Sequence, residues 1–199
     1  MDLSFGAEYE TFRNEVQQFI AANGDKSPKQ GGMGNPESIA WQKTLIDNGY
    51  AARTIPKDYG GFGAEPDIIE SRIIAEEFSN AQISTGLGGQ GISMLTPVLL
   101  EMGTEDQKQR HLTLIAKGGA AWCQGYSEPG AGSDLAALNT KAVLHGDHFQ
   151  IDGQKIWTSF GAVAQYCYLI CRTSNDGPPH AGISEIVVPM NTPGIEARE

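Results

Sequence analysis

The sequence has few cysteines, few basic residues and no long apolar run, and each shortage excludes a class of protein. The three cysteines, Cys123, Cys167 and Cys171, are odd in number and lack the spacing of a metal site, so a reduced, intracellular protein is expected. Lys and Arg number 14 against 24 Asp and Glu, which gives a net charge of −10. That balance disfavours a nucleic-acid or anionic-membrane surface. No apolar stretch approaches membrane-spanning length.

Several other common signals are also missing. The first residues lack the basic and apolar regions of a signal peptide and the arginines of a transit peptide, so we expect a cytoplasmic protein. No G-x-G-x-x-G run lies between a strand and a helix, which disfavours a nicotinamide-binding Rossmann unit. His145 and His148 straddle a Gly-Asp turn without further ligands, so no metal site is expected.

The first 118 residues have the apolar spacing of helices. The first helix would bury one face, formed by Tyr9, Phe12, Val16, Phe19 and Ile20. A second helix is bounded by Asn35-Pro36 and Asn48-Gly49, and others are expected around 66–78 and 92–102. In the third, Ile69, Ile73 and Ile74 would face inward and Glu70, Glu76 and Glu77 outward. Thr104 and Gln107 form a capping box for a last helix, which Gly118-Gly119 ends. We predict an all-α helical domain over residues 1–118.

After Gly119 the pattern changes to short apolar segments separated by turns. The expected strands are 121–126, 141–145, 148–151, 154–159, 166–172 and 183–189. Gly146-Asp147 and Asp152-Gly153 are hairpin signals between them. We therefore predict an antiparallel, barrel-like β domain over residues 119–199, in which Cys167 and Cys171 share one strand face and pack in the core. Residues 195–199 are expected to begin a further strand, which would leave an unpaired edge and indicates an incomplete domain.

Two motifs in the β region point to a bound ligand. In the run from Gln124 to Asp134, Gly130 and Gly132 allow close backbone approach and present bare N–H groups. Ser127 and Ser133 add hydroxyls. The run Gly153–Ser159 adds the indole of Trp157. A flat heteroaromatic cofactor with an anionic tail would use all of these groups, whereas the alternative is an ordinary Gly-rich loop.

The first motif, Tyr126–Asp134, resembles the signature of the acyl-CoA dehydrogenases. Gly103–Lys108, Gly153–Ser159 and Pro56–Gly61 resemble other recurring segments of that family, and the first two fall in the family's order around the signature. The resemblance covers essentially the whole chain, which corresponds to about the first half of such an enzyme. It implies an FAD-dependent enzyme that removes hydrogen from the α and β carbons of an acyl-CoA and passes electrons to an electron-transfer flavoprotein. Fatty-acid or steroid side-chain metabolism and a homo- or hetero-oligomer are also implied.

The resemblance assigns cofactor contacts to individual positions. Gln124, Tyr126 and Ser127 match positions that meet the isoalloxazine ring. Ser133 matches a serine at the phosphate region that also borders the acyl-CoA pocket. Trp157 matches the aromatic residue against the flavin, and Ser159 the hydroxyl near flavin N5. The full implied FAD-binding set is Gln124, Tyr126, Ser127, Gly132, Ser133, Trp157, Thr158 and Ser159.

Each assignment has a plainer alternative, and this chain departs slightly from the family. Trp157 would otherwise be a core aromatic, and Ser159 a hydroxyl satisfied by backbone. Ser127 and Ser159 stand where threonine is also common, which keeps the hydroxyl. Gln124 replaces an aromatic residue of some members, which changes one packing contact.

No catalytic residue is assigned. The carboxylate that removes the α-proton belongs, by the resemblance, to a C-terminal helical domain, and nothing in the 199 residues matches it. Glu128 and Asp134 are expected to order the loop by accepting hydrogen bonds from its amides rather than to act as acid and base. The chain is therefore expected to be a fragment that is inactive alone. Related alternatives are an acyl-CoA oxidase or flavin monooxygenase, and a non-catalytic partner subunit or remnant.

Overall fold

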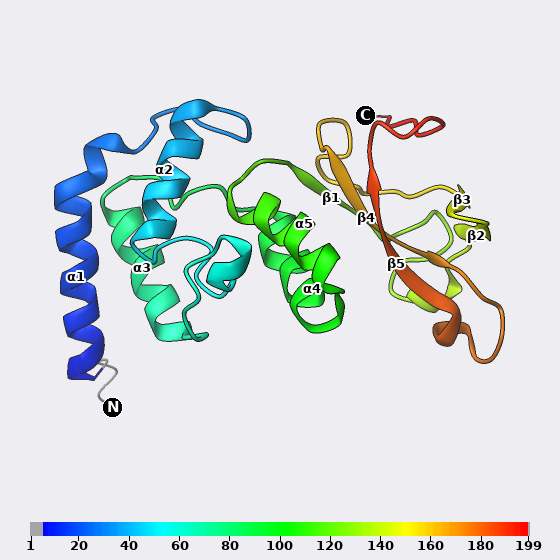
Figure 1. Cartoon of the computed structure of the whole chain (residues 1–199), viewed down its shortest axis with the longest axis horizontal. Coiled ribbons are helices and arrows are strands. Elements are labelled where there is room, and N and C mark those ends of the chain that lie inside the picture. The colour runs from blue at the N-terminus through cyan, green and yellow to red at the C-terminus, as the bar shows by residue number, and fades with distance from the viewer. Residues whose placement is uncertain (1–5, 199) are drawn as a thin grey trace. The chain divides into compact units, whose positions relative to one another are not determined.

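The computed structural model describes residues 6–198 and divides the chain into two compact units, Met1–Gly119 and Ala120–Glu199. The first is helical and the second is built on a sheet (Figure 1), so the predicted order of a helical region and a β region is confirmed. The sheet is mixed rather than wholly antiparallel, and it is not closed into a barrel. None of the described helices is long and apolar enough to cross a membrane.

The described part of the first unit contains five α-helices, three of which begin at side-chain caps. They are α1 (Ala7–Asn23), α2 (Pro36–Asp47), α3 (Ile68–Asn80), α4 (Thr96–Met102) and α5 (Glu105–Ala116), with short 3₁₀ turns at Gly24–Lys26 and Lys57–Tyr59. The Asn35 side chain accepts from the first-turn amides of α2, as predicted. Asp67 does the same for α3, and the Thr104–Gln107 capping box is present.

The predicted helix over 92–102 is not one regular α-helix. Gly91–Leu95 form a π-helical turn, and α4 begins only at Thr96. Pro97 has no N–H to donate to the carbonyl of Ser93, so the regular ladder is interrupted there. The Thr96 N–H and hydroxyl both bond the Gly91 carbonyl, the latter at 3.0 Å.

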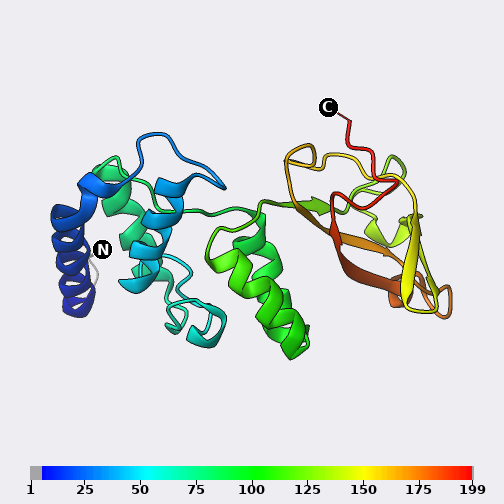
Figure 2. The same ribbon diagram turned by 45° about the horizontal axis from the view of Figure 1, so that its top comes forward.

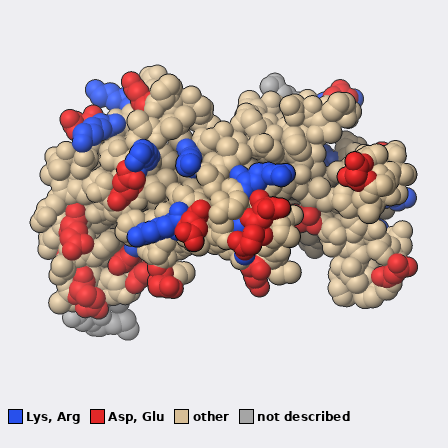
Figure 3. All heavy atoms as spheres, viewed as in Figure 1, with Lys and Arg blue, Asp and Glu red and all other residues tan. Residues whose placement is uncertain are grey.

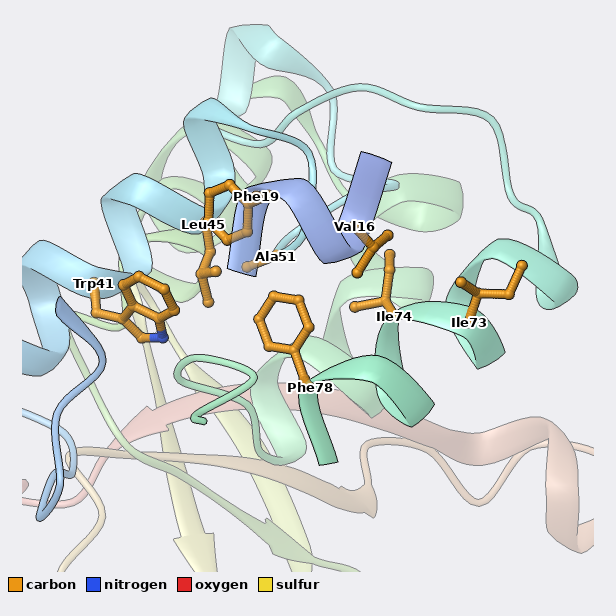
Figure 4. Packing of buried hydrophobic residues seen from close by; sticks show 8 residues of the cluster. All are labelled: Val16, Phe19, Trp41, Leu45, Ala51, Ile73, Ile74 and Phe78. Atoms are coloured by element: carbon orange, nitrogen blue, oxygen red, sulfur yellow. The ribbon is translucent and has the colours of Figure 1, made fainter. Parts of the chain in front are cut away.

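Aromatic and aliphatic side chains from α1, α2 and α3, with Ala51 from the segment after α2, form a core of this unit (Figure 4). The buried members are Val16, Phe19, Trp41, Leu45, Ala51, Ile73, Ile74 and Phe78. The Phe19 ring centroid lies 4.5 Å from that of Tyr50, and the Trp41 indole donates to the Ser84 carbonyl at 2.8 Å. The predicted inward face of α1 is confirmed for its central residues.

Glu77 is buried, which corrects the expectation that it faces outward. Its carboxylate pairs with the Arg13 guanidinium and accepts from the Gln17 amide at 2.9 Å. Both partners come from α1, so a contact distant in sequence compensates the buried charge. On the face shown in Figure 3, basic side chains are interspersed with acidic ones.

In the second unit, the strands are β1 (Trp122–Gly125), β2 (Lys141–His145), β3 (His148–Asp152), β4 (Tyr166–Arg172) and β5 (Ile183–Pro189). β4 is central and pairs with β5 antiparallel and with β1 parallel. β2 meets β4 only at Lys141–Arg172 and forms a hairpin with β3 (Figure 2). The β1–β4 pair is parallel because the long connection between these strands, which includes the hairpin, returns the chain in the same direction.

Residues 154–159 do not form the predicted strand. The backbone φ angles of Trp157 and Phe160 are +57° and +67°, a left-handed conformation that a strand cannot contain. The chain leaves the sheet at Gly153. Only glycine fits there, because a Cβ would lie 2.3 Å from Thr140 Oγ1. No strand occurs in the described part of 195–199 either. Cys167 and Cys171 are buried in one core cluster, as expected.

Candidate cofactor-binding site

The two sequence motifs lie side by side in the β unit. The Ile156 N–H donates to the Ser127 carbonyl at 2.9 Å. The Lys155 ammonium donates to the Tyr126 carbonyl at 2.9 Å and to Glu128 Oε1 at 2.8 Å. The Gly-rich loop that follows β1 is therefore joined to the segment that follows β3. Sequence reasoning placed both segments in one site but missed Lys155, although it lies within the second motif.

Glu128 anchors the Gly-rich loop from inside the protein. The residue is 6% exposed, and its carboxylate accepts from the amides of Asn139 at 2.6 Å and Thr140 at 2.9 Å. Burial disfavours the charged form, but Lys155 and these donors outweigh it and hold the pKa of Glu128 at about 2. A carboxylate that accepts three hydrogen bonds and has so low a pKa is a weak base for proton abstraction. Glu128 was expected to accept from amides of the Gly-rich loop itself, but the amides that it binds belong to Asn139 and Thr140, which follow the loop.

The tip of the loop exposes its backbone. Glu128 and Ala131 exchange two backbone hydrogen bonds, at 2.8 and 3.1 Å, which close the turn. A Cβ placed on Gly130 or Gly132 would meet no atom within 4 Å. Ser133, directly after the turn, is exposed. Open backbone of this kind allows an anionic group to approach N–H donors closely.

Trp157 is 87% exposed, so it is not the core aromatic of the alternative interpretation. Its left-handed φ of +57° costs a non-glycine residue about 1 kcal/mol. The Ser159 N–H bonds the Trp157 carbonyl at 3.0 Å, and the Gly161 N–H bonds the Thr158 carbonyl at 2.9 Å, so a tight turn maintains this geometry. A positive φ at an exposed aromatic residue beside the Gly-rich loop makes Trp157 a candidate binding position.

Thr158 and Tyr126, two further residues of the predicted set, differ in whether their hydroxyls have a hydrogen-bond partner. Within residues 6–198, the buried Thr158 hydroxyl has no hydrogen-bond partner. By contrast, the Tyr126 hydroxyl donates to Glu185 on β5 at 3.0 Å. Burial first, and then the charge and hydrogen bond of Glu185, raise the pKa of Tyr126 to about 12. Ser127 and Gln124 are half-buried, and Ser159 is exposed.

These residues fit the flat, anionic-tailed cofactor that the motifs predict. Gly130 and Gly132 provide the open backbone, and Trp157 provides an uncovered aromatic face. The Thr158 hydroxyl, which has no hydrogen-bond partner among the described residues, could bind a polar atom of such a cofactor. The joined loops place these groups in the same part of the β unit.

Comparison with known families identifies the chain. Residues 6–119 match the acyl-CoA dehydrogenase N-terminal domain, and residues 123–199 match the acyl-CoA dehydrogenase middle domain. The chain therefore belongs to the acyl-CoA dehydrogenase family, as the motifs predicted.

Individual relatives agree with this assignment. The acyl-CoA dehydrogenase IpdE1 of Mycobacterium tuberculosis is 36% identical over 201 residues, which covers 96% of this chain and 51% of the relative. A solved structure described as the Tcur3481-Tcur3483 steroid ACAD has a TM-score of 0.72 at 36% identity and covers 98% of this chain and 50% of its own. The ChsE4-ChsE5 complex from M. tuberculosis has a TM-score of 0.72 at 33% identity, with 96% and 49% covered. The chain spans about half the length of these relatives.

Proposed function

We propose that the chain supplies the FAD-binding region of an acyl-CoA dehydrogenase that introduces an α,β double bond into an acyl-CoA thioester. The observation that carries this proposal is the exposed, strained Trp157 next to the Gly-rich loop, with Lys155 joining the two segments. We further propose that electrons pass to an electron-transfer flavoprotein, as the family resemblance implies.

The comparisons favour a particular substrate class and assembly. The Tcur3481-Tcur3483 structure is described as a steroid ACAD. The descriptions of this structure and of the ChsE4-ChsE5 complex each name two proteins. We therefore propose a steroid-derived acyl-CoA as substrate, in preference to a simple fatty acyl-CoA, and a hetero-oligomer as the working form.

Each site residue has a separate task in this proposal. The bare amides around Gly130 and Gly132, with the Ser133 hydroxyl, would bind the anionic part of FAD and border the acyl-CoA. The Trp157 indole would cover the flavin and exclude water. Ser127, Thr158 and Ser159 would donate hydrogen bonds to the ring system, where negative charge is stabilised as hydride arrives. FAD, when bound, supplies the acceptor for the hydride that leaves the β-carbon.

The α-proton needs a base from elsewhere. Of the two carboxylates in the motif, Glu128 and Asp134, Glu128 already accepts three hydrogen bonds and has a lowered pKa. We propose that the base belongs to sequence outside the 199 residues or to a partner chain.

Spectroscopy of the purified protein tests the proposal. The protein, as isolated or after reconstitution with FAD, should show flavin absorption bands, and acyl-CoA should bleach them once the base is supplied. A released nicotinamide, or failure to bind FAD, would overturn the assignment. Rapid reoxidation of the bleached flavin by air would instead indicate an oxidase or monooxygenase.

A further inference from the structure

Glu185 is a carboxylate in strand β5, whose other residues are apolar apart from Ser184. Its backbone pairs with Ile170 of β4, and its Oε2 accepts from the Tyr126 hydroxyl across 59 residues of sequence. Burial raises the pKa of Glu185, and the hydrogen bond from Tyr126 opposes this rise. Within residues 6–198, no Lys or Arg forms an ion pair with Glu185. The phenol is therefore its principal compensation.

The hydrogen bond crosses the central strand. Tyr126 follows directly after β1, which pairs with one side of β4, whereas β5 pairs with the other. On the way, the Tyr126 ring packs edge-on against Tyr168 of β4, with ring centroids 5.7 Å apart at 76°. The side chain of Tyr126 is thus held at the ring by packing and at the hydroxyl by Glu185.

The backbone of Tyr126 is one of the points that join the two motif segments. Its carbonyl accepts from Lys155 at 2.9 Å, and the next carbonyl, that of Ser127, accepts from Ile156. Glu185 therefore acts on the loop through a continuous series of contacts: carboxylate to phenol, phenol ring to backbone, and backbone to Lys155. A fixed side chain at the start of the loop restricts where the carbonyl lies.

We propose that Glu185 is a positioning residue of the cofactor site. Through Tyr126 it holds the start of the Gly-rich loop where Lys155 can join it to the segment that carries Trp157. The effect on cofactor binding rests on the proposed function, whereas the tether is a property of the chain itself.

The phenol–carboxylate pair suits this role for two reasons. The phenol has one O–H to donate and the Glu185 carboxylate has oxygens that accept, so the two groups match directly. The raised pKa of Tyr126, about 12, keeps the phenol protonated at neutral pH, so that it always donates. The titratable group that faces both members of the pair is Tyr168 on β4, and burial raises the pKa of its phenol.

The test compares variants of the full chain by amide hydrogen exchange over 126–131 and by FAD titration. Tyr126→Phe and Glu185→Ala should each speed exchange several-fold and raise the FAD dissociation constant about fivefold to tenfold. Glu185→Gln retains an acceptor and should stay within about twofold of the parent. Ser184→Ala is the matched control, because it removes the hydroxyl contact with Thr173 from the neighbouring β5 position. The double variant Tyr126→Phe/Glu185→Ala should be no worse than either single variant.

Each outcome decides a separate point. Unchanged exchange in a folded Tyr126→Phe protein would overturn the tether. A loss in Glu185→Gln as large as in Glu185→Ala would also overturn it, because a merely structural charge would then be responsible. If the parent chain binds no FAD while exchange responds as expected, the tether stands and the proposed function fails. Unchanged FAD affinity in variants with faster exchange would refute the positioning role alone.

Discussion

Lys155 bonds the Tyr126 carbonyl and the Glu128 carboxylate at once, at 2.9 and 2.8 Å. The side chains of this ion pair are only 10% and 6% exposed. A buried pair adds little net stability compared with an apolar pair, but removal of one partner leaves an uncompensated charge. The pair therefore makes the position of the Gly-rich loop depend on the segment that carries Trp157.

Lys155→Met should reduce the free energy of unfolding by about 3–5 kcal/mol, because the Glu128 charge would remain buried without its cation. Chemical denaturation followed by circular dichroism measures this loss. Lys141→Met, at an exposed β2 position, is the control and should change stability by less than about 0.5 kcal/mol. The double variant Lys155→Met/Glu128→Gln should recover part of the loss. A loss below about 1 kcal/mol in Lys155→Met would contradict the coupling.

Protonation of Glu128 should lower the free energy of unfolding at acidic pH. Its pKa is lowered from 4.5 to about 2 on folding, so the stabilisation is present above the unfolded pKa and is lost as pH falls through the folded one. The expected loss between about pH 5 and pH 2 is on the order of 3 kcal/mol. Glu185 has the opposite sign, because a raised pKa favours the folded state at low pH. Glu128→Gln should flatten the acid limb of the stability profile, and an unchanged limb would show that other groups dominate.

Trp157→Ala should weaken FAD binding by about 1–3 kcal/mol through lost stacking area. Because the indole is 87% exposed, the stability of the cofactor-free chain should change little. Trp157→Gly should weaken binding similarly. Its free energy of unfolding should be about 0.5–1 kcal/mol higher than that of the alanine variant, because glycine accepts the positive φ. Phe149→Ala, on the exposed β3 hairpin, is the control for loss of a surface aromatic. Equal FAD affinity in all four proteins would remove Trp157 from the site.

Thr158→Val should separate cofactor binding from stability. The Thr158 hydroxyl is buried without a hydrogen-bond partner among the described residues, so valine should leave the cofactor-free chain equally stable or up to about 1 kcal/mol more stable. The same change should weaken FAD binding by about 1 kcal/mol, if the hydroxyl meets the cofactor. Thr158→Ser, which keeps the hydroxyl, should preserve affinity. Loss of stability in Thr158→Val without loss of affinity would mean that the hydroxyl has a structural partner.

The 199-residue chain, reconstituted with FAD, should not dehydrogenate acyl-CoA at a meaningful rate. Proton abstraction needs a base within hydrogen-bond reach of the α-carbon, and the lowered pKa of Glu128 makes it a poor one. Single-turnover bleaching of the flavin by a panel of acyl-CoAs, with analysis for enoyl-CoA, measures the rate. Rapid bleaching with product would place a base within the chain, and Glu128→Gln would then be the first variant to examine.

Much of the secondary structure was determined locally. Asn35 and the Thr104–Gln107 box begin helices because side chain and amide are neighbours in sequence. The β2–β3 hairpin likewise follows from a glycine turn between short strands. The β1–β4 parallel pair was not predictable in this way, because it depends on where a long connection returns the chain.

The sequence by itself determined the family and the two motif segments, because the residue types and their order carry that information. Only the tertiary structure decided how the segments are joined and which side chains remain open. Lys155 meets Glu128 across 27 residues and Tyr126 meets Glu185 across 59, distances at which spacing in a single sequence predicts no contact. The exposure of Trp157 likewise depends on a left-handed turn within a segment whose alternation predicted a strand. The local hydrogen bonds of that turn, together with the bonds from Lys155 and Ile156 to the Gly-rich loop, outweighed the preference for a strand.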